Sequence, residues 1–184
     1  MAYKIAIIVG SLREASLNRK LARSICAMRN DNLECSMIEI GDLPLYNQDS
    51  DANPPEQYVR FRQQITEADG VLFVSPEYNR GIPGVLKNAI DVGSRPYGQS
   101  AWSKKPCAVV SVSPGGLAAF GANHHLRQCL VFLEMPALQM ETYIGNVSKL
   151  FDDKGNLTNE DTRAFLKKTI DAFAAWIEAT AARA

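Results

Sequence analysis

The most unusual stretch of the sequence is GSLREASLNR, residues 10–19, which directly follows an apolar run. Ser11, Ser16 and Asn18 supply hydrogen-bond donors, and Arg13 supplies a planar cation that matches the geometry of a phosphate group. The stretch ends where a helix is expected to begin, and the free N–H groups of a helix N-terminus favour an anion. We therefore interpret it as a phosphate-binding loop. The alternative is that Ser16 only caps the helix and Arg13 is a solvated surface residue.

Two further loops are richer in proline, glycine and small polar residues than a simple turn between a strand and a helix requires. SPEYNRGIPG, residues 75–84, contains prolines and glycines that fix a backbone whose N–H and C=O groups can face a heteroaromatic ring, with Tyr78 beside it. SVSPGG, residues 111–116, has small residues that let a flat ligand approach the backbone closely. The alternatives are a tight turn in which Pro83 starts a helix, and a flexible strand end.

Several other catalytic patterns are absent from the sequence. Neither GxxxxGK[ST] nor GxGxxG occurs around Gly10, which disfavours an ATPase and a Rossmann dinucleotide site. There is no GxSxG sequence, and Ser75 is followed by proline, which argues against a serine hydrolase. His124 and His125 are adjacent, so they cannot form the i, i+4 pair of a helical zinc site, and we expect no metal.

Length, composition and charge narrow the class of protein. A chain of 184 residues with 46% hydrophobic residues predicts a single domain over residues 1–184. Twenty acidic and twenty basic side chains give zero formal net charge, so we expect neither nucleic acid nor a membrane as partner. Four cysteines without a CxxC pair indicate reduced, packed thiols; they are Cys26, Cys35, Cys107 and Cys129. Without a signal-peptide pattern at the N-terminus, we expect a cytoplasmic protein.

Hydrophobic periodicity predicts the elements that position the three loops. Short β-branched runs predict buried parallel strands at residues 5–9, 71–75 and 108–112, with weaker strand candidates at 37–40 and 137–141. Apolar residues at helical spacing predict five helices, marked by Leu17, Leu21, Ile25 and Met28; by Tyr58, Phe61, Ile65 and Ala68; by Leu86, Ala89 and Ile90; by Leu126, Leu130 and Leu133; and by Phe165, Ile170, Phe173, Trp176 and Ile177.

The alternation of strands and helices predicts an α/β fold. We expect a flavodoxin-like, doubly wound, five-stranded parallel sheet in the order 2-1-3-4-5, with helices on both faces. The polar segments 44–55 and 151–159 are interpreted as surface connectors. In such a sheet a ligand binds at the carboxyl ends of the strands, where the strand order reverses. The loops after the first, third and fourth strands are therefore expected to meet at one site.

The three loops together resemble those of the NAD(P)H-dependent FMN reductase family, and within it the chromate and quinone reductase branch. The resemblance is carried by GSLREASLNR at residues 10–19, PEYNRGIPGVLKNAID at 76–91 and SPGG at 113–116, with support from HLRQCLVFL at 125–133. It implies an enzyme that passes hydride from NADPH or NADH through bound FMN to quinones or similar small-molecule acceptors, such as chromate, azo compounds or free flavin.

The resemblance also implies which residues bind the flavin. The phosphate is assigned to the first loop, through the side chains of Ser11, Arg13, Ser16 and Asn18 and the intervening backbone, which includes Leu12 and Leu17. The isoalloxazine ring is assigned to the second loop, Pro76, Glu77, Tyr78, Asn79 and Arg80. Its pyrimidine edge or the ribityl chain is assigned to Ser113 and Gly116. No catalytic side chain is implied, because the flavin carries the hydride chemistry.

Two further implications concern packing and assembly. Where relatives commonly have an aromatic residue after KNAID, this sequence has Val92-Gly93, which affects the packing beneath the second loop and the shape of the acceptor pocket. The resemblance also implies a homodimer or homotetramer, with His125 and Arg127 near a subunit contact. A solvated helix face is the alternative for these two residues.

Other functions remain open at this point. A flavodoxin-type electron carrier, or another FMN-binding protein without its own NAD(P)H activity, is one alternative, although such carriers are strongly acidic and this chain is neutral. A domain that binds a nucleotide or phosphosugar through the first loop alone is another. The sequence does not name the physiological acceptor or decide between NADPH and NADH, although Arg80 offers a cation for a nucleotide phosphate.

Overall fold

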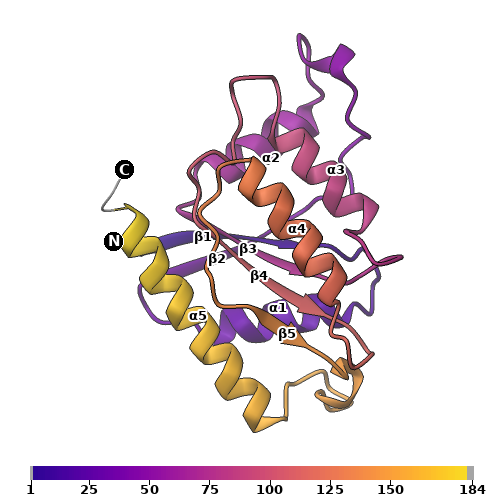
Figure 1. The fold of residues 1–184 in the computed structure, drawn as a ribbon, viewed down its shortest axis with the longest axis vertical. Helices are drawn as coiled ribbons and strands as arrows, with labels where there is room; N and C mark the ends of the chain where they lie inside the picture. Colours follow the sequence, from indigo (N-terminus) through magenta and orange to yellow (C-terminus); the bar gives the residue numbers. More distant parts are fainter. Residues whose placement is uncertain (1, 182–184) are drawn as a thin grey trace.

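A central parallel sheet lies between two layers of helices in the computed structural model, which describes residues 2–181 (Figure 1). The strands are β1 (Tyr3–Val9), β2 (Leu33–Ile38), β3 (Gly70–Ser75), β4 (Cys107–Val112) and β5 (Thr142–Ile144). The helices are α1 (Leu17–Ala27), α2 (Glu56–Thr66), α3 (Gly84–Gly93), α4 (Phe120–Phe132) and α5 (Glu160–Ala181), with short 3-10 helices η1 (Gln48–Ser50) and η2 (Val147–Lys149). The strand order β2-β1-β3-β4-β5, parallel throughout, confirms the predicted fold.

Each face of the sheet has its own hydrophobic core. Along β1, Ile5 and Ile7 pack in the core beneath α1 and α5, whereas Ala6 and Ile8 pack in the core beneath α2, α3 and α4. Successive residues of a strand point to opposite faces, so a strand that is covered on both sides must be apolar at every position. This explains the unbroken apolar runs of β1, β3 and β4. The cover also hides the sheet from solvent except at its edges (Figure 1).

The two weaker strand predictions differ from the structure. Residues 37–40 were expected to form the second strand, but β2 spans Leu33–Ile38. The prediction missed the start of this strand because an edge strand exposes much of its surface, so its sequence mixes polar and apolar residues. The prediction of the fifth strand at residues 137–141 was wrong, because β5 begins at Thr142. The carbonyls of Leu138 and Met140 accept hydrogen bonds from the Arg127 side chain. Of the predicted helical positions, Met28, Ala68 and Leu133 lie just beyond the helix ends.

The four cysteines are free thiols, but two of them are not isolated. Cys107 lies inside β4, where burial raises the pKa of its thiol to about 12. Cys26 and Cys35 are nine residues apart in the sequence, on α1 and β2, and the hydrogen bond between their thiols raises the pKa of Cys26 and lowers that of Cys35. The four free thiols agree with the expectation of reduced cysteines. Across the part of the chain that is described, no helix has the length and apolar character to cross a bilayer.

The Val92-Gly93 pair is explained by a tryptophan from the following loop. A Cβ atom added to Gly93 would lie 2.4–2.5 Å from three atoms of the Trp102 indole. That indole is fully buried, donates its Nε1–H to the carbonyl of Ile90 at 2.9 Å, and meets Phe61 edge to face with ring centroids 5.8 Å apart. An aromatic side chain after KNAID has no room here. The Trp102 ring fills this space and packs beside Phe61 and Phe73.

Replacing Gly93 with alanine is therefore expected to destabilise the fold by about 1–3 kcal/mol, because the rigid indole must move to admit the methyl group. In a chain of this size the melting temperature then falls by roughly 2–4 °C per kcal/mol. Gly84→Ala is the matched control: nothing lies within 4 Å of a Cβ at this first position of α3. Calorimetry that finds the two variants equally stable would contradict the packing account.

Candidate functional site

The predicted loops meet at a cavity of about 420 Å³ at the carboxyl ends of β1, β3, β4 and β5. It is lined by Ser11, Arg13, Ser16, Leu17, Asn18, Pro76, Glu77, Tyr78, Val112, Ser113, Pro114, Val147 and Ser148. Most of the predicted site residues are therefore brought together. The parallel sheet causes this convergence, because all its strands end at the same edge.

The first loop presents unpaired donors to this cavity. Ser16 is the N-cap of α1, and its Oγ accepts a hydrogen bond from the Arg19 amide at 3.2 Å. The expected capping role of Ser16 is therefore confirmed. Its hydroxyl hydrogen is still free to donate. Among the described residues, none accepts a bond from the backbone amides of residues 11–15, 17 or 18. The first turn of α1 contains no acidic residue, so the positive end of the helix dipole is not neutralised.

Asn18 provides the strongest sign of a missing ligand. Its side chain is 7% exposed and lines the cavity, yet its amide oxygen has no hydrogen-bond partner in the part of the chain that is described. Leaving a buried polar group unpaired costs about 1–3 kcal/mol, so such groups usually face a partner from outside the protein. Ser11 and Ser16, 5% and 2% exposed, are the other buried polar residues of this loop that line the cavity.

The second loop is a tight turn. Tyr78 and Gly81 exchange backbone hydrogen bonds of 3.1 and 2.9 Å, and the two residues between them have positive φ angles, 50° at Asn79 and 66° at Arg80. Non-glycine residues adopt this left-handed conformation uncommonly. The turn leaves Tyr78 52% exposed at the cavity. A flat ligand in the cavity can therefore contact an aromatic ring at the surface.

Glu77 connects the second loop to α4. One carboxylate oxygen forms an ion pair with Arg80 at 3.1 Å, and the other accepts a hydrogen bond from the Ala122 amide at 2.9 Å. The N-cap of α4 is Ala119, which has no side chain that can cap, so Glu77 caps this helix from another part of the chain. The Glu77 side chain is 13% exposed. Sequence reasoning placed Glu77 beside the ligand and missed this structural role.

The third loop is held by the segment that follows β5. The Ser113 amide donates to the Ile144 carbonyl at 3.0 Å, and the Val147 amide donates to the Ser113 carbonyl at 3.2 Å. These bonds bring Val147 and Ser148 to the cavity, and neither was predicted. The signal that could have found them is their position after the fifth strand, because the rule that selected the other loops applies to every parallel strand.

Four predicted site residues do not line the cavity: Leu12, Asn79, Arg80 and Gly116. Leu12 is half exposed and leans over Gly41, where an added Cβ would be 2.9 Å from it. Asn79 and Arg80 form the exposed tip of the second loop. The Gly116 carbonyl faces Gly145 instead. Their roles as ligand contacts stay predictions.

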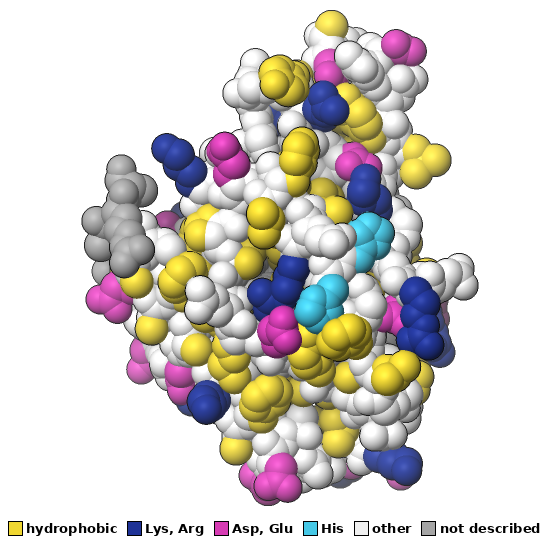
Figure 2. Space-filling view, viewed as in Figure 1, with side chains coloured by type: hydrophobic (Ala, Val, Ile, Leu, Met, Phe, Trp, Pro, Cys, Tyr) yellow, Lys and Arg dark blue, Asp and Glu magenta, His cyan; other side chains and the backbone are white. Residues whose placement is uncertain are grey.

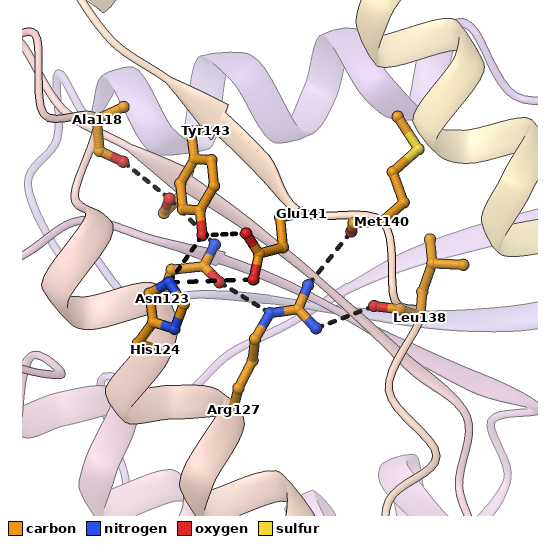
Figure 3. Close-up of polar contacts among 9 residues, drawn as sticks. Ala118, Asn123, His124, Arg127, Leu138, Met140, Glu141 and Tyr143 are labelled. Atoms are coloured by element: carbon orange, nitrogen blue, oxygen red, sulfur yellow. Dashed lines mark hydrogen bonds and ion pairs between the residues drawn. The ribbon is translucent and has the colours of Figure 1, made fainter.

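A network of polar contacts links α4 to β4, to β5 and to the segment that precedes β5 (Figure 3). Arg127 donates to the Asn123 side chain at 2.9 Å and to the carbonyls of Leu138 and Met140 at 3.0 and 3.2 Å. Asn123 in turn donates to the hydroxyl of Ser111, at the end of β4. The Arg127 side chain, predicted near a subunit contact, is therefore engaged within its own chain.

The same region holds a hydrogen-bonded tyrosine. The Tyr143 hydroxyl donates to Glu141 at 2.7 Å and lies 3.0 Å from Nε2 of His124 (Figure 3). Burial, together with the Glu141 carboxylate, raises the pKa of Tyr143 to about 12, so it stays a neutral donor. His125, the other histidine, is exposed and lies over Gly81. The described residues contain no group of three or more side chains suited to hold a metal ion.

Comparison with known proteins identifies the family. Residues 3–149 match the NADPH-dependent FMN reductases. The chain belongs to this family. It is 59% identical to a quinone reductase of Pseudomonas putida over 96% of this chain and 95% of that one. It is 45% identical to a 2-hydroxy-1,4-benzoquinone reductase of Burkholderia sp. over 96% and 97%.

A solved structure of the same kind is also similar. FerB, a flavoenzyme NAD(P)H:(acceptor) oxidoreductase from Paracoccus denitrificans, is 41% identical and superposes with a TM-score of 0.92, covering 97% of this chain and 99% of that one. The predicted family is therefore confirmed, and with it FMN and NAD(P)H as the cofactor and co-substrate of the family.

The residues present also fit FMN on structural grounds. The flavin carries a phosphate at one end and a flat ring at the other. The cavity has uncompensated donors on the α1 side and an exposed aromatic residue, Tyr78, on the β3 side. Ser113 and Asn18 also line it, and the Asn18 amide oxygen has no partner among the described residues. A phosphorylated flat ligand satisfies both ends.

Proposed function

We propose that this protein is an FMN-dependent NAD(P)H:quinone oxidoreductase whose flavin binds in the cavity described above. The observation that carries the proposal is the set of unpaired donors around Asn18 at the N-terminus of α1. The quinone substrates of the relatives from Pseudomonas putida and Burkholderia sp. support a quinone as acceptor. Chromate, azo compounds and free flavin are the further acceptors we propose, because each needs only access to a reduced flavin.

In this proposal the first loop binds the FMN phosphate. Arg13 supplies a charge-assisted contact, the Ser11 and Ser16 hydroxyls donate hydrogen bonds, and the free amides of residues 11–15, 17 and 18 complete the shell. The buried amide oxygen of Asn18 is an acceptor, so its partner in this proposal is a hydroxyl of the FMN ribityl chain, while the NH2 group of the same amide can donate to the phosphate. Together these groups fix the position and register of the cofactor.

The second loop borders the redox end of the cofactor. When bound there, FMN would supply the hydride chemistry between NAD(P)H and the acceptor. Among the described residues, none accepts a bond from the amides of Glu77, Asn79 or Arg80, so these donors are available to stabilise negative charge on the ring. The exposed Tyr78 lies beside an open face, where donor and acceptor can bind in turn.

Anaerobic titration tests this function. The protein is loaded with FMN, and its visible spectrum is recorded during additions of NADPH and then NADH. We expect bleaching by at least one donor without any partner protein, and reoxidation by 1,4-benzoquinone, with chromate, an azo dye and free FMN as comparisons. A flavin that stays oxidised would favour an electron carrier. A colourless protein that does not bind added FMN would leave only the alternative of a domain that binds a nucleotide or phosphosugar through the first loop.

We further propose that the protein forms a homodimer or homotetramer through the exposed side of α4. Val131 and Phe132, at its C-terminal end, are 70% and 85% exposed, and Tyr97 nearby in the fold is 90% exposed. Figure 2 shows hydrophobic side chains over α4 and around the two histidines on this face. Large apolar side chains gathered on one face mark interaction surfaces. The occupant is a second copy of this chain.

Phe132→Glu is expected to shift the protein toward a smaller species, because a charge in an apolar interface loses its hydration without gaining a partner. Sedimentation velocity measures the change, and flavin content confirms that the subunit is folded. Val59→Glu, at a half-exposed position on α2, is the control and should leave the assembly unchanged. An identical sedimentation coefficient for both variants would place the interface elsewhere.

We place the protein in the cytoplasm. All four cysteines are free thiols, as expected for a reducing compartment, and a cytoplasmic oxidoreductase has direct access to NADPH and NADH. Cell fractionation with an antibody to the protein tests this placement.

A further inference from the structure

A second cavity, of about 400 Å³, lies on the outer side of α1 and shares no lining residue with the candidate flavin site. It is lined by Lys20, Arg23, Ser24, Ala27, Met28, Lys154, Gly155, Asn156, Leu157 and Arg163. Four of these residues are cations and none is a carboxylate. A chain with twenty acidic and twenty basic residues has therefore gathered four positive charges around one hollow.

Three separate elements contribute these cations. Lys20 and Arg23 lie on one stripe of α1, three residues apart, while Leu21 and Ile25 on the opposite side of the helix are buried in the core. The connector after β5 supplies Lys154, and the first turn of α5 supplies Arg163.

The connector lies against Lys20 because of one glycine. Gly155 has a φ of +83°, and a Cβ there would lie 3.5 Å from the Cε of Lys20. A residue with a side chain rarely adopts that backbone conformation, so glycine allows the turn to lie close to α1. Residues 134 positions apart, Lys20 and Lys154, thereby reach the same hollow.

Two carboxylates near this cavity contact its lining residues, and a third, Asp153, is exposed. Asp152 accepts hydrogen bonds from the backbone and the side chain of Asn156, at 2.8 and 2.9 Å. Glu160 lies 3.6 Å from Arg163, on a side chain that is 81% exposed. Among the residues that the structure describes, Lys20, Arg23 and Lys154 form no ion pair. Their charges therefore remain available to a bound anion.

We propose that this cavity binds a small molecule that carries two or more phosphate charges. Cations on opposite sides of the hollow, on α1 and on the connector with α5, favour an anion with several charges over a single carboxylate. Leu157, which is buried, and Ala27 give the cavity an apolar side, which suits a ligand with an organic group beside its phosphates. A hollow of this size matches a small molecule better than a membrane surface.

Titration calorimetry on FMN-loaded protein tests the proposal, because the flavin then occupies the other anion-binding site. Inorganic pyrophosphate and ATP are the probes, and adenosine tests the organic group alone. We expect both phosphates to bind and adenosine not to bind. The double variant Lys20→Gln, Arg23→Gln should raise the Kd of pyrophosphate at least about tenfold, since each charge-assisted contact is worth about 1.5–3 kcal/mol. Added salt should weaken binding to the unmodified protein.

Two controls isolate the cavity. Lys104→Gln, Lys168→Gln removes the same charge from exposed positions outside it and should keep the original Kd. Repeating the titration at a higher concentration of free FMN should give the same Kd, which excludes binding at the phosphate loop of the flavin site. Absence of pyrophosphate binding, an unchanged Kd in the Lys20 and Arg23 double variant, or binding only to vesicles that contain anionic lipid would overturn the proposal.

Discussion

Arg13→Ala is expected to weaken FMN binding by about 1.5–3 kcal/mol, the usual worth of a hydrogen bond to a charged group. This corresponds to a rise in Kd of roughly ten- to a hundredfold. Arg13 lines the cavity beside the unpaired amides of the first loop, where a phosphate is the group that these donors fit. Quenching of flavin fluorescence during titration of the apoprotein measures the change.

Arg19→Ala is the matched control for this prediction. Arg19 is an arginine of the same helix end that does not line the cavity, so its removal changes the charge equally while leaving the proposed contact intact. We expect its FMN affinity to stay within about twofold of the original, a difference below about 0.5 kcal/mol. If both variants lose the same affinity, the effect of Arg13 is general electrostatics. If neither changes, Arg13 is a solvated surface residue.

Glu77→Ala is expected to lower both stability and flavin affinity. The Ala122 amide would lose its only acceptor among the described residues, at a cost of about 1–3 kcal/mol for a partly buried donor. Arg80 would lose its ion pair as well, so the strained turn at the tip of the second loop would be less firmly held. Thermal unfolding and FMN titration together measure the two effects.

Glu77→Gln separates the two contacts of this side chain. Its amide oxygen can still accept from the Ala122 amide, but the ion pair with Arg80 is lost. We expect most of the stability to return. Glu178→Ala, on the exposed side of α5, controls for the loss of a carboxylate and should unfold at the original temperature. A Glu77→Ala protein as stable as this control would show that α4 does not depend on the cap.

These predictions separate the two tasks of the site. Arg13 contacts the ligand in our proposal, whereas Glu77 acts by holding the second loop against α4. A loss of affinity with unchanged stability is therefore expected only for Arg13. The distinction matters because sequence reasoning had assigned both residues to the flavin.

Local patterns in the sequence were enough to predict the fold and most of the site. The runs of β1, β3 and β4 are apolar because both faces are covered. Alternation with helices predicts a parallel sheet, and the flavodoxin-like order expected for such a sheet is the one observed. The first loop was recognisable because a helix cap and its free amides involve residues only a few positions apart. The weak, partly exposed edge strands β2 and β5 were the exceptions.

What the sequence by itself determined is therefore the family, the sheet and three of the loops that meet at its edge. Only the tertiary structure showed that Glu77 caps α4, that Trp102 fills the space beside Gly93, and that the segment after β5 lines the cavity. It alone also brought Lys20 and Lys154 to one hollow. These contacts join residues far apart in the chain. Periodicity and capping signals extend over a few residues, so they contain no record of such pairings.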